Sequence, residues 1–170
     1  IKSVDAICTL PINKESWGKA KLKYKGHTEV LRDFYNKEAI MMLGCQKMYV
    51  ALFTEHIALK DVAKSIKTKK LINFFKNFHS CTNAKKIAVL ALNPHAGDGG
   101  VLGKKEKKIQ KAIKKANKIL GEDIFSNPLV PDTAFSPNNR KNYKYFIAMY
   151  HDQGLAPLKA LYFDESINVS

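Results

Sequence analysis

Cysteine is scarce in this chain, and its three copies stand far apart. Cys8, Cys45 and Cys81 form no Cys-x-x-Cys pair. An odd number of widely spaced cysteines argues against a disulfide framework and against a thiolate zinc site. The sequence therefore favours a reducing, cytoplasmic setting.

Long hydrophobic runs are also lacking. The longest apolar runs have about six residues, whereas a membrane-spanning helix needs roughly 18 to 20. The first residues follow no signal-peptide layout and include no initiator methionine. Both ends lie in strand-like runs. We therefore expect residues 1–170 to be the central part of a longer protein, including most of one α/β domain.

Arginine is nearly absent, although the net charge is +14. Only Arg32 and Arg140 are arginines, and arginine is the usual choice for bidentate contacts to bases and phosphates. In the densest basic stretch, 104–118, the apolar residues fall on one helical stripe, which leaves the lysines on a solvated face. We interpret the charge as a lysine-rich surface, with a basic nucleic-acid-binding domain as the alternative.

Strand and helix signals alternate along the chain. Apolar runs predict strands at 4–10, 39–43, 48–53, 87–92 and 145–149, with a turn at 44–47. Helical periodicity predicts helices after Thr28, over 59–66, after Thr68 with a phenylalanine-rich core face, over the basic stretch up to Gly121, and over 154–161 with an interruption near Pro157. This alternation predicts an α/β layered fold with a largely parallel sheet.

Three histidines stand beside turns or strand ends. His95 and His151 each follow a short apolar run and precede an acid and glycines, and His27 follows a glycine. Strand-end loops carry the chemistry of α/β proteins, and three imidazoles with one open position make a catalytic metal site. No spacing rule joins the three, so loop histidines bonded to backbone remain the alternative. His56 and His79 have weaker contexts.

The glycine-rich segment 97–103 lies between a predicted strand and a predicted helix. This is the order of a phosphate-cradling turn, but the spacing matches neither a dinucleotide fingerprint nor a P-loop. We expect a ligand-facing loop. Lys159 lies eight residues past His151. A lone lysine is usually a surface residue, and Asn168 is uninformative alone.

The segments 9–14, 26–29, 93–100 and 149–154, taken together and in this order, resemble motifs of the 4-hydroxythreonine-4-phosphate dehydrogenases. That family serves the biosynthesis of pyridoxal 5'-phosphate, and the resemblance extends over essentially all 170 residues. It implies a three-layer α/β/α fold like that of the isocitrate and isopropylmalate dehydrogenases. It also implies a homodimer whose active site is shared between subunits.

The resemblance further implies an activity. NAD or NADP would oxidise 4-phosphohydroxy-L-threonine in the presence of a divalent metal (Zn, Mg or Co), and decarboxylation to 3-amino-2-oxopropyl phosphate would follow. A metal-dependent hydrolase using the same histidines is the alternative. Part of the active site is expected to lie outside the chain, so the chain alone is expected to be inactive.

Site residues follow from the same resemblance. His27, His95 and His151 match the metal ligands, the third reaching across from the partner subunit. Lys159 and Asn168 match substrate-contacting residues, and we assign catalytic roles to Lys159 and Asp152. No residues are assigned to the nicotinamide cofactor.

Overall fold

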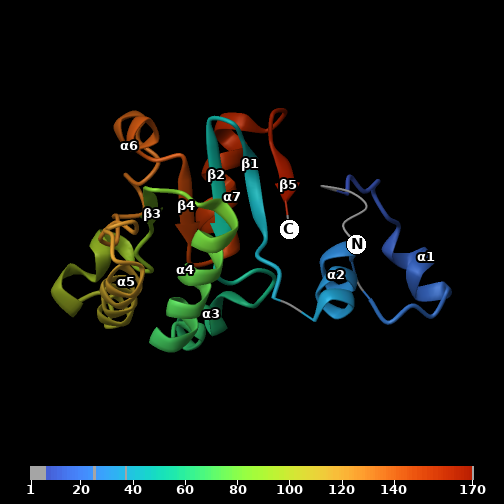
Figure 1. The fold of residues 1–170 in the computed structure, drawn as a ribbon, viewed down its shortest axis with the longest axis horizontal. Helices are drawn as coiled ribbons and strands as arrows, with labels where there is room; N and C mark the ends of the chain where they lie inside the picture. Colours follow the sequence, from blue (N-terminus) through green and yellow to red (C-terminus); the bar gives the residue numbers. More distant parts are fainter. Residues whose placement is uncertain (1–6, 25, 37, 170) are drawn as a thin grey trace. The chain divides into compact units, whose positions relative to one another are not determined.

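A computed structural model describes residues 7–24, 26–36 and 38–169. Contacts divide the chain into two compact units, one formed by the residues up to Ala39 and the other by Ile40–Val169. Figure 1 shows both, and each is described by itself.

The first unit contains two short helices, α1 (Lys14–Lys19) and α2 (His27–Tyr35). Asn13 caps α1, because its side chain accepts a hydrogen bond from the backbone N–H of Ser16 at 2.8 Å. The residue that caps α2 is Gly26, so the helix begins before Thr28 and not after it as predicted.

The strand predicted at 4–10 is also not confirmed. Residues 7–10 have no regular structure, and Ile7 and Leu10 are 64% and 83% exposed. Residues 4–6 lie outside the described residues. An apolar run becomes a strand only where another strand pairs with it, and within the described residues nothing pairs with 7–10.

The second unit is built on a five-stranded sheet of order β3-β4-β2-β1-β5. Its strands are β1 (Met42–Cys45), β2 (Met48–Leu52), β3 (Ile87–Val89), β4 (Tyr145–Ala148) and β5 (Ile167–Val169). β3, β4 and β2 are parallel, whereas β1 is antiparallel to both β2 and β5. The sheet is therefore mixed rather than largely parallel. The two-residue turn at Gln46 and Lys47 forces β1 and β2 into a hairpin, which is antiparallel by construction.

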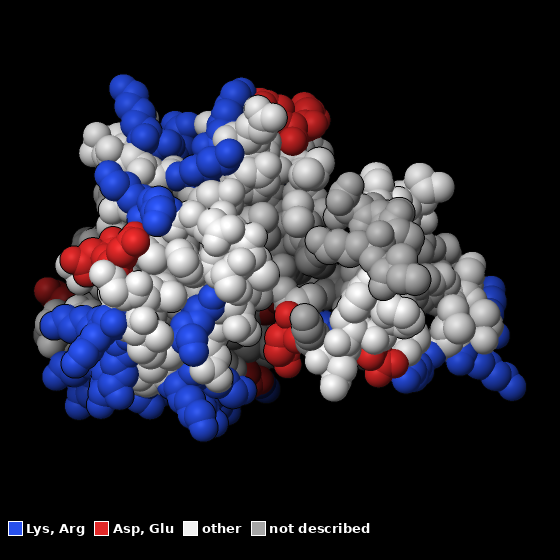
Figure 2. Space-filling model, in the orientation of Figure 1, with Lys and Arg blue, Asp and Glu red and all other residues white. Residues whose placement is uncertain are grey.

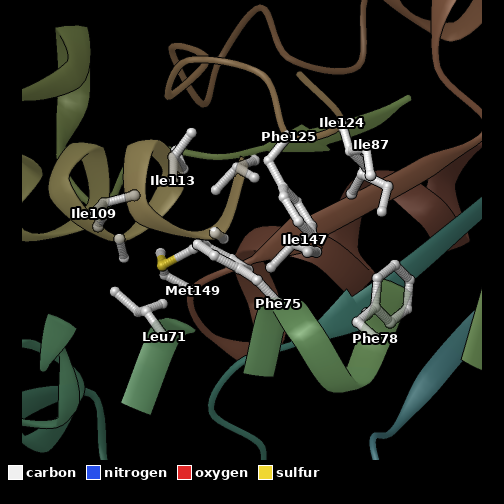
Figure 3. Close-up of a cluster of buried hydrophobic side chains, with 14 of the residues drawn as sticks. Leu71, Phe75, Phe78, Ile87, Ile109, Ile113, Ile124, Phe125, Ile147 and Met149 are labelled. Atoms are coloured by element: carbon white, nitrogen blue, oxygen red, sulfur yellow. The ribbon is translucent and has the colours of Figure 1, made fainter. Parts of the chain in front are cut away.

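Helices cover both faces of the sheet (Figure 1). They are α3 (Leu59–Ser65), α4 (Thr68–Thr82), α5 (Glu106–Leu120), α6 (Pro137–Asn142) and α7 (His151–Tyr162). Successive strand residues point to opposite faces, so β4 sends Ile147 to one core and Phe146 to the other. The core in Figure 3 joins Phe75 of α4, Ile109 of α5 and Ile147. On the other face, Leu158 of α7 packs with Phe146.

The two longest helices follow their sequence patterns. The phenylalanines of α4 are core residues as predicted, with Phe75 and Phe78 buried. Lys67 is the cap of α4, so the helix begins at Thr68 itself and not after it as predicted. Helix α5 ends at Gly121, whose φ of 76° is the left-handed conformation that glycine adopts without strain. Its lysines face outward, and Figure 2 shows Lys and Arg side chains gathered over the region of α5.

The last helix differs from its prediction in two ways. It begins at His151 rather than at 154, and it continues through Pro157. A proline inside a helix costs about 3 kcal/mol. Burial of Leu155 and Leu158 against the sheet stabilises the helix by roughly 1.5–3 kcal/mol per side chain. The two burials together contribute about 3–6 kcal/mol, which matches or exceeds the cost of the proline, so the helix does not break.

Candidate functional site

The carboxyl ends of β2, β3 and β4 lie at one edge of the sheet, because the three strands are parallel neighbours. Each strand is followed by a segment that contains a histidine. His56 follows β2, His95 follows β3, and His151 follows β4. In open α/β sheets, ligands bind outside the carboxyl ends of the strands. This edge is therefore the candidate functional site.

His151 is the first residue of α7, and its side chain is 34% exposed. Its Nδ1 lies 2.8 Å from Oδ1 of Asp152, whose side chain is 87% exposed. When Nδ1 carries the proton it donates to this carboxylate, and Nε2 is then left as the lone-pair atom. In that tautomer, the hydrogen bond to Asp152 leaves Nε2 of His151 available to bind a cation or to accept a proton.

Gln153 fastens the turn that carries His151. Its Oε1 accepts a hydrogen bond from the backbone N–H of Met149 at 2.7 Å, and its Nε2 donates to the carbonyl of Ala91 at 2.7 Å. The hydroxyl of Thr54, which is buried, donates to the carbonyl of Met149 at 2.6 Å. These bonds tie the ends of β2, β3 and β4 together. Gln153 belongs to the motif 149–154, whereas Thr54 is marked in the sequence only by its position near a strand end.

His56 is the site residue that sequence reasoning underrated. Its ring centroid lies 5.4 Å from that of His151, and the two rings are tilted by 42°. His56 is exposed, so its ring is open to solvent or to a ligand. Glu55 precedes it, but no acid or glycine closely follows it as in the segments of His95 and His151. The available signal was that it follows the apolar run of β2 by four residues.

His95 lies in a tight left-handed turn rather than in an open glycine loop. The turn spans Pro94–Gly100, and the φ angles of residues 95–99 are all positive, 50° at His95 and 82° at Gly97. His95 is exposed at the surface of this turn. The predicted ligand-facing loop thus begins before the first glycine of the segment 97–103, and its backbone is tightly wound.

His27 belongs to the first unit, where it is the first residue of α2. Its ring meets the ring of Trp17 edge to face, with centroids 5.7 Å apart. Of the three predicted metal ligands, the structure brings His95 and His151 to one edge of the sheet. Within the described residues, no three His, Cys, Asp or Glu side chains are gathered closely enough to hold a metal ion.

Lys159 and Asn168 occupy different elements. Lys159 lies in a helix, as predicted, and because α7 begins at His151 it shares that helix with His151, about 12 Å further along the axis at 1.5 Å per residue. It is exposed, with Nζ 5.9 Å from the ring centroid of Phe163. Asn168 is exposed on β5, opposite Leu43 of β1. Neither side chain is placed against a histidine.

A pocket of about 550 Å³ adjoins the turn that carries His151. Tyr150 and Gln153 contribute to its wall, together with Asp132 and Ser136 from the segment before α6. Apolar residues complete the lining: Pro131, Phe135, Pro157, Ala160 and Leu161. A mostly apolar pocket with a few polar groups is typical of a small-molecule site.

Among the described helices, none is long and apolar enough to cross a membrane.

Comparison with known proteins identifies relatives along the whole chain. The family model described as "Pyridoxal phosphate biosynthetic protein PdxA" matches residues 1–170. The 4-hydroxythreonine-4-phosphate dehydrogenase of Sulfurimonas denitrificans is 65% identical over 169 residues, which are 99% of this chain and 55% of the relative. The enzyme of the same name from Campylobacter fetus is 53% identical over 170 residues, with the same coverage. The chain thus spans about half the length of these relatives.

Solved structures agree in fold. The crystal structure of the 4-hydroxythreonine-4-phosphate dehydrogenase from Klebsiella pneumoniae superposes with a TM-score of 0.81 at 30% identity, covering 94% of this chain and 51% of that one. A terephthalate 1,2-cis-dihydrodiol dehydrogenase from Burkholderia xenovorans superposes with a TM-score of 0.62 at 18% identity over 84% of this chain and 48% of that one, which shows a shared fold alone.

Proposed function

Because the chain belongs to the PdxA family of pyridoxal phosphate biosynthetic proteins, we propose that the complete protein is an NAD- or NADP-dependent 4-hydroxythreonine-4-phosphate dehydrogenase. It oxidises 4-phosphohydroxy-L-threonine, and the product loses CO2 to give 3-amino-2-oxopropyl phosphate. The relatives that carry this name match 99% of the chain. The fold proposed for the complete enzyme is the three-layer arrangement of the isocitrate dehydrogenases.

The observation that carries this proposal is the set of histidines at one edge of the sheet. His56, His95 and His151 follow three parallel neighbouring strands. Their donor chemistry fits a divalent cation, since neutral imidazole is a common ligand of zinc and cobalt. When bound there, the cation would polarise the substrate hydroxyl and stabilise negative charge that develops on the neighbouring oxygen.

The third ligand has two candidates. The resemblance in sequence favours His27 beside His95 and His151. The geometry favours His56, whose ring lies 5.4 Å from that of His151 in the same unit. We propose His56 on this ground. His27 then remains a residue for substrate contact, in a segment that the family motif also includes.

The remaining residues act either on His151 or on the substrate. Asp152 holds the His151 ring through Nδ1 and keeps it oriented toward the site. Lys159 supplies a point charge for an anionic group of the substrate, and Asn168 supplies an amide for a hydrogen bond. The pocket lined by Tyr150 and Gln153 is open beside His151 and has room for part of the substrate or cofactor.

The complete protein is proposed to act as a homodimer in the cytoplasm. Val101 and Leu102, which follow the His95 turn directly, are 82% and 47% exposed. Exposed apolar side chains next to a site are what a subunit interface would cover. The cysteines Cys8, Cys45 and Cys81 are free thiols, which suits a reducing compartment.

The test is a coupled measurement on the complete protein. With phosphorylated hydroxythreonine, metal and cofactor present, absorbance of the reduced nicotinamide should rise, and it should not rise when any one is left out. Release of a hydrolysis product without reduction of the nicotinamide would identify a hydrolase instead. Separate assays with NAD and NADP decide the acceptor.

Substitution assigns the metal ligands. His56→Ala, His95→Ala and His151→Ala should each lower bound metal, measured by elemental analysis after dialysis, whereas His27→Ala should retain metal and lose substrate affinity. Loss of metal in His27→Ala with full metal in His56→Ala would reverse the choice between the two.

A further inference from the structure

Glu106 is a buried acid inside the most basic stretch of the chain. It is the first residue of α5, it is 5% exposed, and lysines stand on both sides of it at 104, 105, 107 and 108. Burying a carboxylate is costly unless hydrogen bonds compensate for the lost water. The bonds that Glu106 makes therefore indicate what its burial achieves.

Those bonds are made to the segment that leads into the His95 turn. Oε1 of Glu106 accepts a hydrogen bond from the backbone N–H of Asn93 at 2.9 Å and another from Nδ2 of Asn93 at 2.9 Å. Hydrogen bonds to a charged acceptor are stronger than those between neutral groups. Glu106 also stands at the positive end of the α5 dipole, where an acidic side chain is favourably placed.

Two glycines let the turn close around this pair. A Cβ on Gly97 would lie 2.8 Å from Oε2 of Glu106, and a Cβ on Gly103 would collide with the side-chain amide of Asn93. The turn thus wraps closely over the carboxylate. Oε2 itself is buried and accepts no hydrogen bond from the described part of the chain.

The turn needs such support because its backbone is strained. His95, Ala96 and Asp98 have φ angles of 50°, 51° and 43°. A left-handed conformation is unfavourable for a non-glycine residue, because its Cβ comes too close to the backbone. Consecutive residues of this kind persist only where the surroundings hold them. In the described residues, the bonds from Asn93 to Glu106 are the side-chain anchor at the start of this turn.

We propose that Glu106 is a positioning residue for His95: its buried carboxylate, acting through Asn93, holds the left-handed turn that presents the His95 imidazole at the sheet edge. This rests on the proposed function, in which His95 binds the cation. Substitution of a residue that orients a metal ligand through hydrogen bonds typically lowers metal affinity 10- to 100-fold.

The test measures zinc affinity in the complete protein after removal of metal, by competition with a fluorescent zinc chelator. Glu106→Ala should weaken zinc binding by at least about tenfold. Glu106→Gln keeps an acceptor oxygen for Asn93, so its affinity should be closer to wild type than to Glu106→Ala. Asn93→Ala removes one of the two hydrogen bonds and should weaken zinc binding by a smaller factor.

Asn117→Ala is the matched control. Asn117 lies at the other end of α5 and makes the same kind of clamp: its Oδ1 accepts from the N–H of Phe125, and its Nδ2 donates to the carbonyl of Phe125, both at 3.0 Å. This variant should lower the melting temperature about as much as Glu106→Ala and leave zinc affinity unchanged. Equal loss of zinc affinity in both variants would reduce Glu106 to a structural residue.

A double variant separates the two levels of the proposal. If Glu106 acts through His95, then His95→Ala with Glu106→Ala should bind zinc no more weakly than His95→Ala alone. If His95→Ala retains full zinc affinity, the proposed metal role of His95 fails. If His95→Ala loses zinc while Glu106→Ala and Asn93→Ala both retain it, only the positioning role of Glu106 is overturned.

Discussion

At the scale of single residues, the site is governed by which side chains fix each histidine. His151 is held by an exposed acid, Asp152, whereas the His95 turn is anchored by a buried one, Glu106. An exposed contact is weakened by solvent and salt, and a buried contact is screened much less. The two histidines should therefore respond differently to ionic strength and to loss of their supporting acid.

Lys159 gives the first prediction at this scale. The side chain is exposed, so Lys159→Ala should change stability by no more than about 0.5 kcal/mol. If it contacts an anionic group of the substrate, kcat/KM of the complete enzyme should fall at least about tenfold, equivalent to about 1.4 kcal/mol at the transition state. Lys111→Ala, on the exposed face of α5, is the control and should leave both quantities unchanged. Unchanged kinetics in Lys159→Ala would return it to the solvated surface.

Asp33 gives a prediction about pH in the first unit. The Tyr24 hydroxyl donates a hydrogen bond to its carboxylate, and Lys23 bonds to it as well, so the pKa of Asp33 is lowered from 3.8. A depressed pKa means that these contacts stabilise the unit above about pH 3.8 and that the stabilisation is lost as pH falls through the folded pKa. A carbon-13 NMR titration of the Asp33 carboxyl should give a pKa below 3.8, and Tyr24→Phe should raise that pKa. Tyr35→Phe is the control: Tyr35 lies on the same helix as Asp33, and its substitution should leave the pKa of Asp33 unchanged.

At the scale of elements, the close approach of α7 to the sheet sets the position of His151. A Cβ on Gly154 would lie 2.5 Å from Cγ1 of Val50 and 2.8 Å from Cβ of Ala148. The side chain of Val50 can rotate, but Cβ of Ala148 moves only with the backbone of β4. The helix can therefore relieve such a contact only by moving away from the sheet.

Gly154→Ala should accordingly destabilise the protein. Overpacking of this kind costs typically 1–3 kcal/mol, which exceeds the gain of roughly 0.8–1 kcal/mol in helix propensity. Urea unfolding measures the difference. Gly18→Ala, in α1, is the control because no atom lies within 4 Å of the added Cβ; it should be neutral or stabilising. A Gly154→Ala variant as stable as wild type would show that α7 adjusts without cost.

At the scale of the whole molecule, one site contains residues of either one subunit or two, depending on which chain supplies each histidine. The resemblance in sequence implies that the ligand matching His151 crosses from the partner subunit, whereas the structure places His56 and His151 side by side in one chain. In the first arrangement, each site depends on two chains. In the second, one chain supplies both His56 and His151 to the same site.

Mixed dimers of the complete protein distinguish the two arrangements. If one subunit supplies His95 and its partner supplies His151, mixing inactive His95→Ala and His151→Ala subunits should restore one intact site per mixed dimer, or about a quarter of wild-type activity in a statistical mixture. If both ligands come from the same chain, no activity returns. Sedimentation must show dimers before and after mixing, and each variant mixed with itself is the control.

The sequence by itself determined the strand-end position of His95 and His151, the helices α3 to α5 and the lysine-rich outer face of α5. It also indicated a hairpin at β1 and β2, although β1 begins three residues later than predicted and its turn is shorter. All of these depend on local signals, namely apolar periodicity, glycine at a helix end and short turns. Motifs of consecutive residues also carried the family, which the comparisons confirm.

Only the tertiary structure decided the order of the strands, the irregularity of residues 7–10, the continuity of α7 through Pro157 and the pairing of His56 with His151. Strand order depends on pairing between segments far apart in the chain. Helix α7 continues through Pro157 because its leucines are buried against the sheet, whose strands lie elsewhere in the sequence. His56 lies 95 residues from His151, and no short motif encodes a contact over that distance. The two histidines meet because β2 and β4 pair in parallel, which places the carboxyl ends of both strands side by side.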